Sequence, residues 1–120
     1  MNIIIIGAGM SGITSLRWST FYNFKPIVLE KNKNIGGCWV DKSYENIRLQ
    51  TTKYSYGFSD HIYPENTSLY PTGKEVINYF NSYLDKHDLR KYIQFNSEVK
   101  DINWNKSKWE VKYKKDNKEH

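Results

Sequence analysis

The stretch Asn2-Ile3-Ile4-Ile5-Ile6-Gly7-Ala8-Gly9-Met10-Ser11-Gly12 decides how this chain folds. Its β-branched apolar run is typical of a strand buried on both faces, and the Gly-x-Gly-x-x-Gly turn that follows opens a helix. Apolar residues at helical spacing extend that helix to about Tyr22, and a second apolar run, Pro26-Ile27-Val28-Leu29, ends at Glu30. The sequence therefore predicts an α/β fold built on a Rossmann-like βαβ unit, the arrangement that binds dinucleotides.

Each glycine of the turn has a separate physical role. Gly7 permits a tight turn out of the strand, Gly9 lets the backbone approach a pyrophosphate, and Gly12 allows the helix to pack closely on the strand. The free N–H groups and the positive dipole end of the helix that starts near Met10 and Ser11 would face the pyrophosphate.

Glu30 stands eighteen residues beyond Gly12, at the end of the second apolar run. An acid at this place accepts hydrogen bonds from ribose hydroxyls and repels a 2′-phosphate, so the first site is expected to take FAD or NAD rather than NADP. The alternative is a solvated carboxylate at a strand end, without a ligand.

Length and composition set limits on the class of protein. The 120 residues suffice for one small domain, and 38% hydrophobic with 16% aromatic residues can form a packed core. The formal charge of +5 comes mainly from lysines of the last fifteen residues, where interspersed acids favour a solvated hairpin face over a nucleic-acid patch.

The cysteine content excludes an internal disulfide and a cysteine-rich metal site. A single cysteine, Cys38, allows no internal disulfide and no cysteine-rich metal site, and it fits a reducing compartment. The apolar run at the N-terminus is too short for a transmembrane segment and lacks the features of a signal peptide. We therefore expect a cytoplasmic chain with no metal site.

Residues 31–71 show no sustained periodicity, which in a compact domain favours a functional loop over a linker. Within them, Ile35-Gly36-Gly37-Cys38-Trp39 stands out, because adjacent glycines let the backbone lie against a ligand and Trp39 supplies a flat surface. One interpretation is that this segment contacts a bound cofactor from its pyrophosphate to its flavin. An ordinary turn followed by a core tryptophan is the other.

The remaining elements follow from capping and periodicity. Thr72 and Glu75 form a capping box that predicts a helix to about His87, and residues 92–95 are expected to form a third parallel strand. Alternation over 99–104 and 109–113 predicts an antiparallel β-hairpin. We expect a Rossmann-like domain over residues 1–114 and a frayed polar tail over 115–120.

With these residues in place, the whole chain resembles the N-terminal part of flavin-containing monooxygenases, particularly the plant type. The glycine turn alone is shared by many flavoproteins, whereas the acid followed by Gly-Gly-x-Trp and Leu-Gln-Thr is a narrower signal. The resemblance rests on the glycine turn, Glu30-Lys31, Ile35–Trp39, Ile47–Lys53, Phe58-Ser59-Asp60, Tyr70-Pro71 and Phe95–Val99.

The resemblance implies roles for individual residues of an FAD site. It implies that Gly7, Gly9, Ser11 and Gly12 hold the pyrophosphate, that Glu30 holds the adenosine ribose and that Val99 lies against the adenine. It further implies that Gly37, Cys38 and Trp39 lie along the ribityl and flavin side, with Gln50 and Thr51 near the isoalloxazine.

The resemblance also implies an activity, NADPH-dependent monooxygenation. Hydride passes from NADPH to FAD, and the reduced flavin activates dioxygen for transfer of one oxygen to a soft nitrogen or sulfur nucleophile, with no catalytic side chain required. The alternatives are a non-catalytic dinucleotide-binding remnant or interaction module, and a Baeyer–Villiger-type flavoprotein monooxygenase.

The family's later motifs are not found in this chain. The NADPH-binding glycine turn and the strand that completes the FAD-binding sheet would lie beyond the equivalent of His120. We therefore expect a Rossmann-like domain that is incomplete at its C-terminus, with unpaired backbone groups along the open side of the Ile3–Ile6 strand. The 120-residue chain by itself is expected to retain FAD weakly or not at all and to be inactive, with NADPH and substrate bound only by a full-length form.

Overall fold

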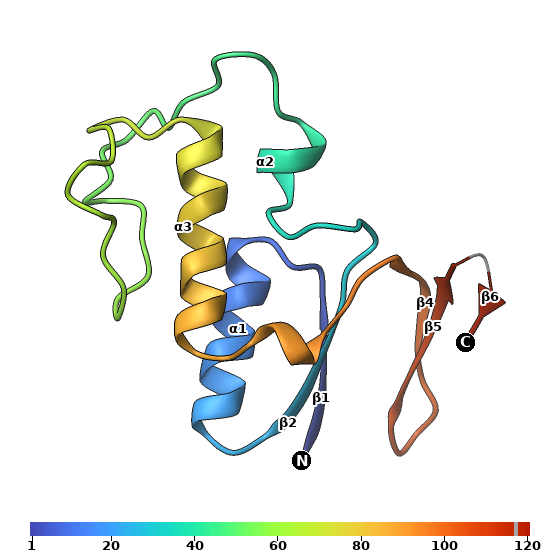
Figure 1. Ribbon diagram of the computed structural model, residues 1–120. Coiled ribbons are helices and arrows are strands. Elements are labelled where there is room, and N and C mark those ends of the chain that lie inside the picture. Colours follow the sequence, from blue (N-terminus) through green and yellow to red (C-terminus); the bar gives the residue numbers. More distant parts are fainter. Residues whose placement is uncertain (117) are drawn as a thin grey trace.

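The computed structural model describes residues 1–116 and 118–120. Figure 1 shows two helices packed side by side against a small sheet, with a β-hairpin reaching away from the other side. The helices and strands are β1 (Asn2–Ile6), α1 (Met10–Phe21), β2 (Lys25–Leu29), α2 (Cys38–Asp41), α3 (Gly73–Lys86), a 3₁₀ turn (Arg90–Tyr92), β3 (Ile93–Gln94), β4 (Ser97–Trp104), β5 (Trp109–Lys115) and β6 (Lys118–Glu119).

The first sheet confirms the expected βαβ unit. Its three strands run parallel in the order β1-β2-β3, and Ile5 of β1 lies in register with Val28 of β2. On α1, Ile13 and Leu16 are completely buried against this sheet. The helix begins at Met10, directly after the glycine turn, so the local order read from the sequence is the order of the fold.

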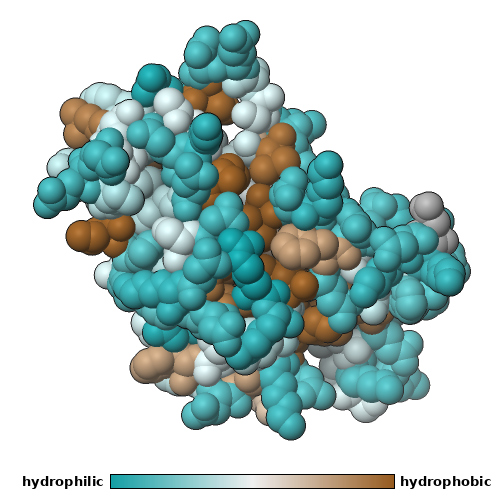
Figure 2. All heavy atoms as spheres, in the orientation of Figure 1, coloured by the Kyte–Doolittle hydropathy of each residue, from teal (hydrophilic) through white to brown (hydrophobic). Residues whose placement is uncertain are grey.

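The expectation that the first strand is buried on both faces is wrong. Ile5 is 9% exposed on the side of the helices, whereas Ile4 and Ile6 on the opposite face are 46% and 51% exposed. Among the described residues, that second face of β1 is therefore only partly covered, and β4 and β5 belong to a separate sheet. Figure 2 shows a band of hydrophobic side chains running down the middle of the molecule between hydrophilic flanks.

The open side of β1 is as expected. β1 is the edge of its sheet and pairs only with β2 in the described part of the chain. The apolar run of β1 carries no charge and no proline, the devices by which proteins protect an exposed edge. This edge is therefore the segment of the fold most prone to strand-to-strand aggregation.

Helix α3 is fixed by its cap and by one apolar face. Thr72 Oγ1 accepts the Glu75 N–H at 3.2 Å, and Glu75 Oε2 accepts the Thr72 N–H at 2.8 Å, which confirms the capping box. The buried side chains recur at spacings of three and four residues, so they form one face toward the core; they are Val76, Tyr79, Phe80, Tyr83 and Leu84.

The capping box predicts a pH-dependent contribution to stability. Hydrogen bonds from the Ser68 and Thr72 N–H groups hold the pKa of Glu75 at about 2, below its ordinary value of 4.5. A depressed carboxyl pKa contributes stability above the unfolded pKa, and that contribution is lost as the pH falls from about 4.5 toward 2. In urea unfolding, we expect Glu75→Gln to cost about 1 kcal/mol at pH 7 and less at pH 3.

The exposed Glu65 on the preceding turn provides a matched control, because its side chain is outside the capping box. Glu65→Gln is expected to leave the unfolding midpoint unchanged at both pH values. A Glu75→Gln cost that stays constant from pH 7 to pH 3 would contradict the assignment of this pH dependence to the capping carboxylate.

The C-terminal part forms the expected hairpin and differs from expectation in the tail. β4 and β5 pair antiparallel, with Trp104 opposite Trp109 across the turn, and β6 then pairs with β5 over two residues. Residues 118–120 are thus tied to the sheet, because the His120 N–H and carbonyl both bond to Tyr113, where we expected fraying. Residue 117 lies outside the described residues.

The helices are all short relative to a lipid bilayer. Among the described residues, no helix has the length and apolar character needed to cross a membrane.

Candidate functional site

The N-terminus of α1 offers unoccupied backbone donors. Its N-cap is Gly9, which has no side chain to accept a hydrogen bond, and the first turn carries no acid. Gly7 has a φ of +90°, the conformation that permits the turn out of β1 and that other residues adopt only with strain. The positive end of the helix dipole and its free N–H groups are therefore presented at the end of β1.

Two glycine turns meet at this point. A Cβ built on Gly37 would lie 3.3 Å from the Cα of Gly9, and the Gly36 N–H donates to the Ala8 carbonyl at 3.0 Å. Gly36 and Gly37 both have positive φ values, +127° and +56°. The loop after β2 thus comes close to the α1 N-terminus through backbone alone, which leaves room beside it.

Two adjoining cavities open on either side of this contact. One, of about 360 Å³, lies on the side of the helix N-terminus, and the other, of about 290 Å³, lies on the side of the β2 end; they share Ile6, Gly7, Gly9 and Gly37. Together they bring together ten of the residues predicted for the site: Gly7, Gly9, Met10, Ser11, Gly12, Glu30, Gly37, Cys38, Trp39 and Val99.

Glu30 is held from the backbone. Its side chain lies at the second cavity, where Oε2 accepts the Ala8 N–H at 2.6 Å and Oε1 accepts the Asn32 N–H at 2.8 Å. The residue is 3% exposed, so the alternative of a solvated carboxylate at a strand end is wrong. A buried carboxylate between two backbone donors keeps lone pairs in fixed directions, as an acceptor of ribose hydroxyls requires.

The structure adds an ion pair at the second cavity that the sequence did not indicate. Lys31 Nζ lies 3.1 Å from Asp41 Oδ2, and the side-chain amide of Asn32 donates Nδ2–H to Asp41 Oδ1 at 2.7 Å. The hydrogen bond with Asp41 raises the pKa of Lys31 above its ordinary value. These contacts tie the end of α2 to the residues after β2, and both charged residues line the cavity.

The position of Trp39 is compatible with both of its interpretations, and its contact with a flavin stays a prediction. It is half-buried against the core and also lines the first cavity, where its Nε1–H donates to the Tyr56 hydroxyl at 3.0 Å. Tyr56 lines the same cavity and was missed, because no periodicity or motif marks it within residues 31–71. Gln50 and Thr51 are exposed and line neither cavity, so their placement near a flavin stays a prediction.

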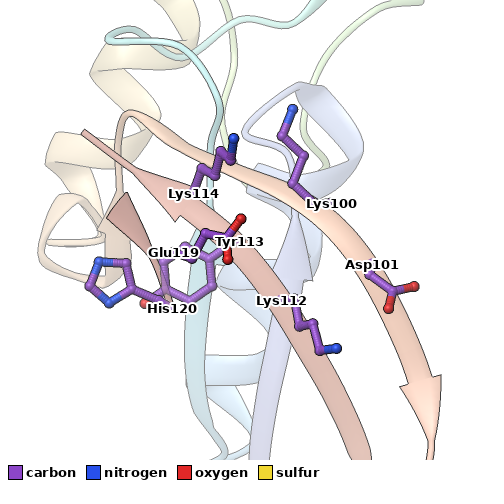
Figure 3. Close-up of a pocket in the computed structure, with 7 residues that line it drawn as sticks. All are labelled: Lys100, Asp101, Lys112, Tyr113, Lys114, Glu119 and His120. Carbon is purple, nitrogen blue, oxygen red and sulfur yellow. The ribbon is translucent and has the colours of Figure 1, made fainter. Parts of the chain in front are cut away.

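Two larger cavities lie outside the predicted site. One, of about 660 Å³, is bounded by residues 53–65. The other, of about 390 Å³, lies on the hairpin, where Figure 3 shows Lys100 and Lys114 pointing the same way and His120 stacked beside Tyr113. This hairpin cavity contains none of the residues predicted for the site. The described residues also include no cluster of three or more potential metal ligands.

The arrangement fits one end of a dinucleotide. Free amides at a helix N-terminus suit a pyrophosphate, the bare backbone of Gly9 leaves its path open, and Glu30 lines the adjoining cavity. Val99, at the far wall of that cavity, offers an apolar surface for an adenine ring.

Comparison with known proteins agrees with this interpretation. A model of the flavin-binding monooxygenase-like family matches residues 1–120. The probable flavin-containing monooxygenase 1 of Arabidopsis thaliana is 34% identical over 103 residues, which are 84% of this chain and 19% of that protein. Flavin-containing monooxygenase 5 of Mus musculus is 32% identical over 107 residues, 82% of this chain and 20% of that protein.

A solved structure shows the same fold with both nucleotides. The structure of OTEMO in complex with FAD and NADP superposes with a TM-score of 0.86 at 28% identity, over 98% of this chain and 23% of that one. The chain thus spans about a fifth of the length of the curated relatives that it matches.

Proposed function

Because this chain belongs to the flavin-binding monooxygenase-like family, we propose that it is the FAD-binding portion of an NADPH-dependent monooxygenase that oxygenates soft nitrogen or sulfur nucleophiles. The observation that carries the proposal is the junction of β1 and α1. There an uncapped helix N-terminus, a bare glycine backbone and a buried acid line two adjoining cavities.

Each part of the junction has a binding role. The α1 N-terminus, through the backbone of Met10, Ser11 and Gly12, holds the pyrophosphate. Glu30 accepts the ribose hydroxyls and disfavours a 2′-phosphate, and Val99 contacts the adenine. The adenosine half of FAD therefore occupies the cavity beside β2, and its flavin half leaves past the second glycine turn.

The flavin half lies along Gly37, Cys38 and Trp39. Bound FAD would supply the redox chemistry, so the protein's part is to orient the ring and to limit water around it. Trp39 is suited to this, because its indole is held in place by Tyr56 at the wall of the first cavity. We propose that the NADPH site and the substrate pocket lie outside these 120 residues. We also propose that the protein is located in the cytoplasm.

A series of nucleotides tests the binding site. We expect the 120-residue chain to bind FAD and ADP weakly, with dissociation constants of roughly 10 μM to 1 mM, and not to oxidise NADPH. AMP lacks the pyrophosphate and should bind at least about tenfold more weakly than ADP, since it forgoes charge-assisted bonds to the helix N-terminus. Isothermal titration calorimetry measures the affinities for ADP and AMP, and quenching of flavin fluorescence measures the affinity for FAD.

Two results would contradict the proposal. Equal affinities for ADP and AMP would show that the pyrophosphate does not rest on the α1 N-terminus. Stoichiometric FAD in the purified chain, together with NADPH consumption, would show that the chain is a complete enzyme and not a binding portion of one.

A further inference from the structure

Residues 50–57 begin with Gln50 and Thr51, which are predicted to lie near the flavin, and contain no helix or strand. We call these residues the flavin-side segment. Its Tyr56 lines the first cavity and accepts the Trp39 indole N–H. A wall that positions a cofactor must itself be held in place, so the fixed points on either side of this segment are of interest.

On its C-terminal side, the flavin-side segment is attached to the helices through Asp60. Tyr83 of α3 donates its hydroxyl to Asp60 Oδ1 at 2.7 Å, and Arg17 of α1 donates Nε–H to Oδ2 at 3.3 Å. Lys86, the last residue of α3, and His87, which follows the helix, also contact this residue. Lys86 Nζ donates to the Asp60 carbonyl at 2.6 Å, and His87 Nε2 lies 3.3 Å from Oδ2. One carboxylate thus joins a loop to two helices.

An aromatic stack next to Asp60 also attaches the loop to α3. The Phe58 ring stacks on Tyr83 with ring centroids 3.8 Å apart, and the Phe58 N–H donates to the Tyr79 hydroxyl at 2.8 Å. That hydroxyl in turn donates to the His61 carbonyl at 2.5 Å. The stack attaches the loop to α3 alone, whereas α1 reaches the loop through Arg17 and Asp60.

The charge of Asp60 is needed for this link. Burial raises the pKa of the Asp60 carboxyl, but hydrogen bonds from Tyr83, from the Asp60 backbone and from Arg17, together with the charge of His87, outweigh it and hold the pKa below its ordinary value of 3.8. Arg17 is only 18% exposed, so loss of the negative charge would leave a partly buried guanidinium without its counter-ion.

We propose that Asp60 is a positioning residue for the flavin-binding site. Its carboxylate ties the end of the flavin-side segment to α1, the helix of the pyrophosphate turn, and to α3. The wall formed by Tyr56 and Trp39 is thereby fixed relative to the helix N-terminus before any ligand binds. The inference rests on the proposed function only for its second consequence, the effect on FAD; the first, the order of the segment, concerns the protein alone.

Hydrogen exchange of the ligand-free protein tests the first consequence. In Asp60→Asn, the amides of Lys53, Ser55 and Phe58 are expected to exchange at least about tenfold faster, because the segment loses its link to α1. The amides of Ile13 in α1 and Val76 in α3 should be unaffected. Asp85→Asn is a matched control, since Asp85 on the same α3 pairs with Arg90 at 2.7 Å and is 63% exposed.

A ratio of affinities tests the second consequence. ADP lacks the flavin half, so Asp60→Asn should leave its affinity unchanged and weaken FAD about fivefold, whereas Asp85→Asn should change neither. Exchange that matches Asp85→Asn, or that rises equally in Ile13 and Val76, overturns the proposal, as does an equal loss of FAD and ADP. If the wild-type chain binds neither nucleotide, the proposed function fails, and the exchange experiment still decides the role of Asp60.

Discussion

Gly12→Ala is expected to destabilise the fold by about 2–4 kcal/mol, a large part of the stability of a small domain. A Cβ at Gly12 would lie 1.9 Å from the Gly7 carbonyl oxygen and 3.0 Å from the Gly7 carbonyl carbon. Both are backbone atoms of the turn between β1 and α1, so the helix would have to move away from the strand. The gain of about 1 kcal/mol from replacing glycine in a helix does not offset such a clash.

Urea unfolding followed by circular dichroism measures this loss of stability. Gly9→Ala is the matched control within the same turn, because a Cβ at Gly9 meets only the Gly37 Cα at 3.8 Å, an ordinary contact. We expect its unfolding midpoint to stay near that of the wild type. If Gly12→Ala unfolded at the same urea concentration as Gly9→Ala, the close approach of α1 to the turn would be refuted.

Gly9→Val is expected to abolish nucleotide binding while the chain stays folded, with at least about a 100-fold loss of FAD and ADP affinity, or about 2.7 kcal/mol. Gly9 has a φ of −77°, which other residues adopt without strain, and a Cβ there makes only an ordinary contact with the Gly37 Cα at 3.8 Å. The two methyl groups of valine would therefore fill the cavity beside the helix N-terminus, which is the expected path of the pyrophosphate.

Flavin fluorescence and calorimetric titration measure that loss, and circular dichroism verifies that the variant is folded. Gly9→Ala adds one carbon in place of three, so an intermediate affinity is expected for it. A Gly9→Val chain that is folded and binds FAD and ADP as the wild type does would remove the pyrophosphate from this turn. Together the two glycines then separate the requirements of folding from those of binding.

The sequence sufficed where the fold depends on residues close together in the chain. The first thirty residues contain the strand, the glycine turn, the helix and Glu30, and their order determines the junction of β1 and α1. The capping box at Thr72 spans three residues and was equally visible. In each case a backbone requirement, a positive φ or an unsatisfied N–H, selects a narrow set of residue types.

The contacts that were missed join residues far apart. Arg17 and Asp60 are 43 positions apart, and Trp39 and Tyr56 are 17 apart. The partner of such a residue depends on how the stretch 31–71 is laid over the helices, which no periodicity encodes. The exposed face of β1 was missed for a related reason, since an apolar run does not reveal whether another layer covers it.

Cys38 gives the molecule a practical property. It is the chain's single thiol, it is exposed, and it lines the cavity at the α1 N-terminus. A maleimide dye or a spin label would therefore attach at one defined position without any engineered cysteine. Such a probe would report on events in the cavity at the α1 N-terminus.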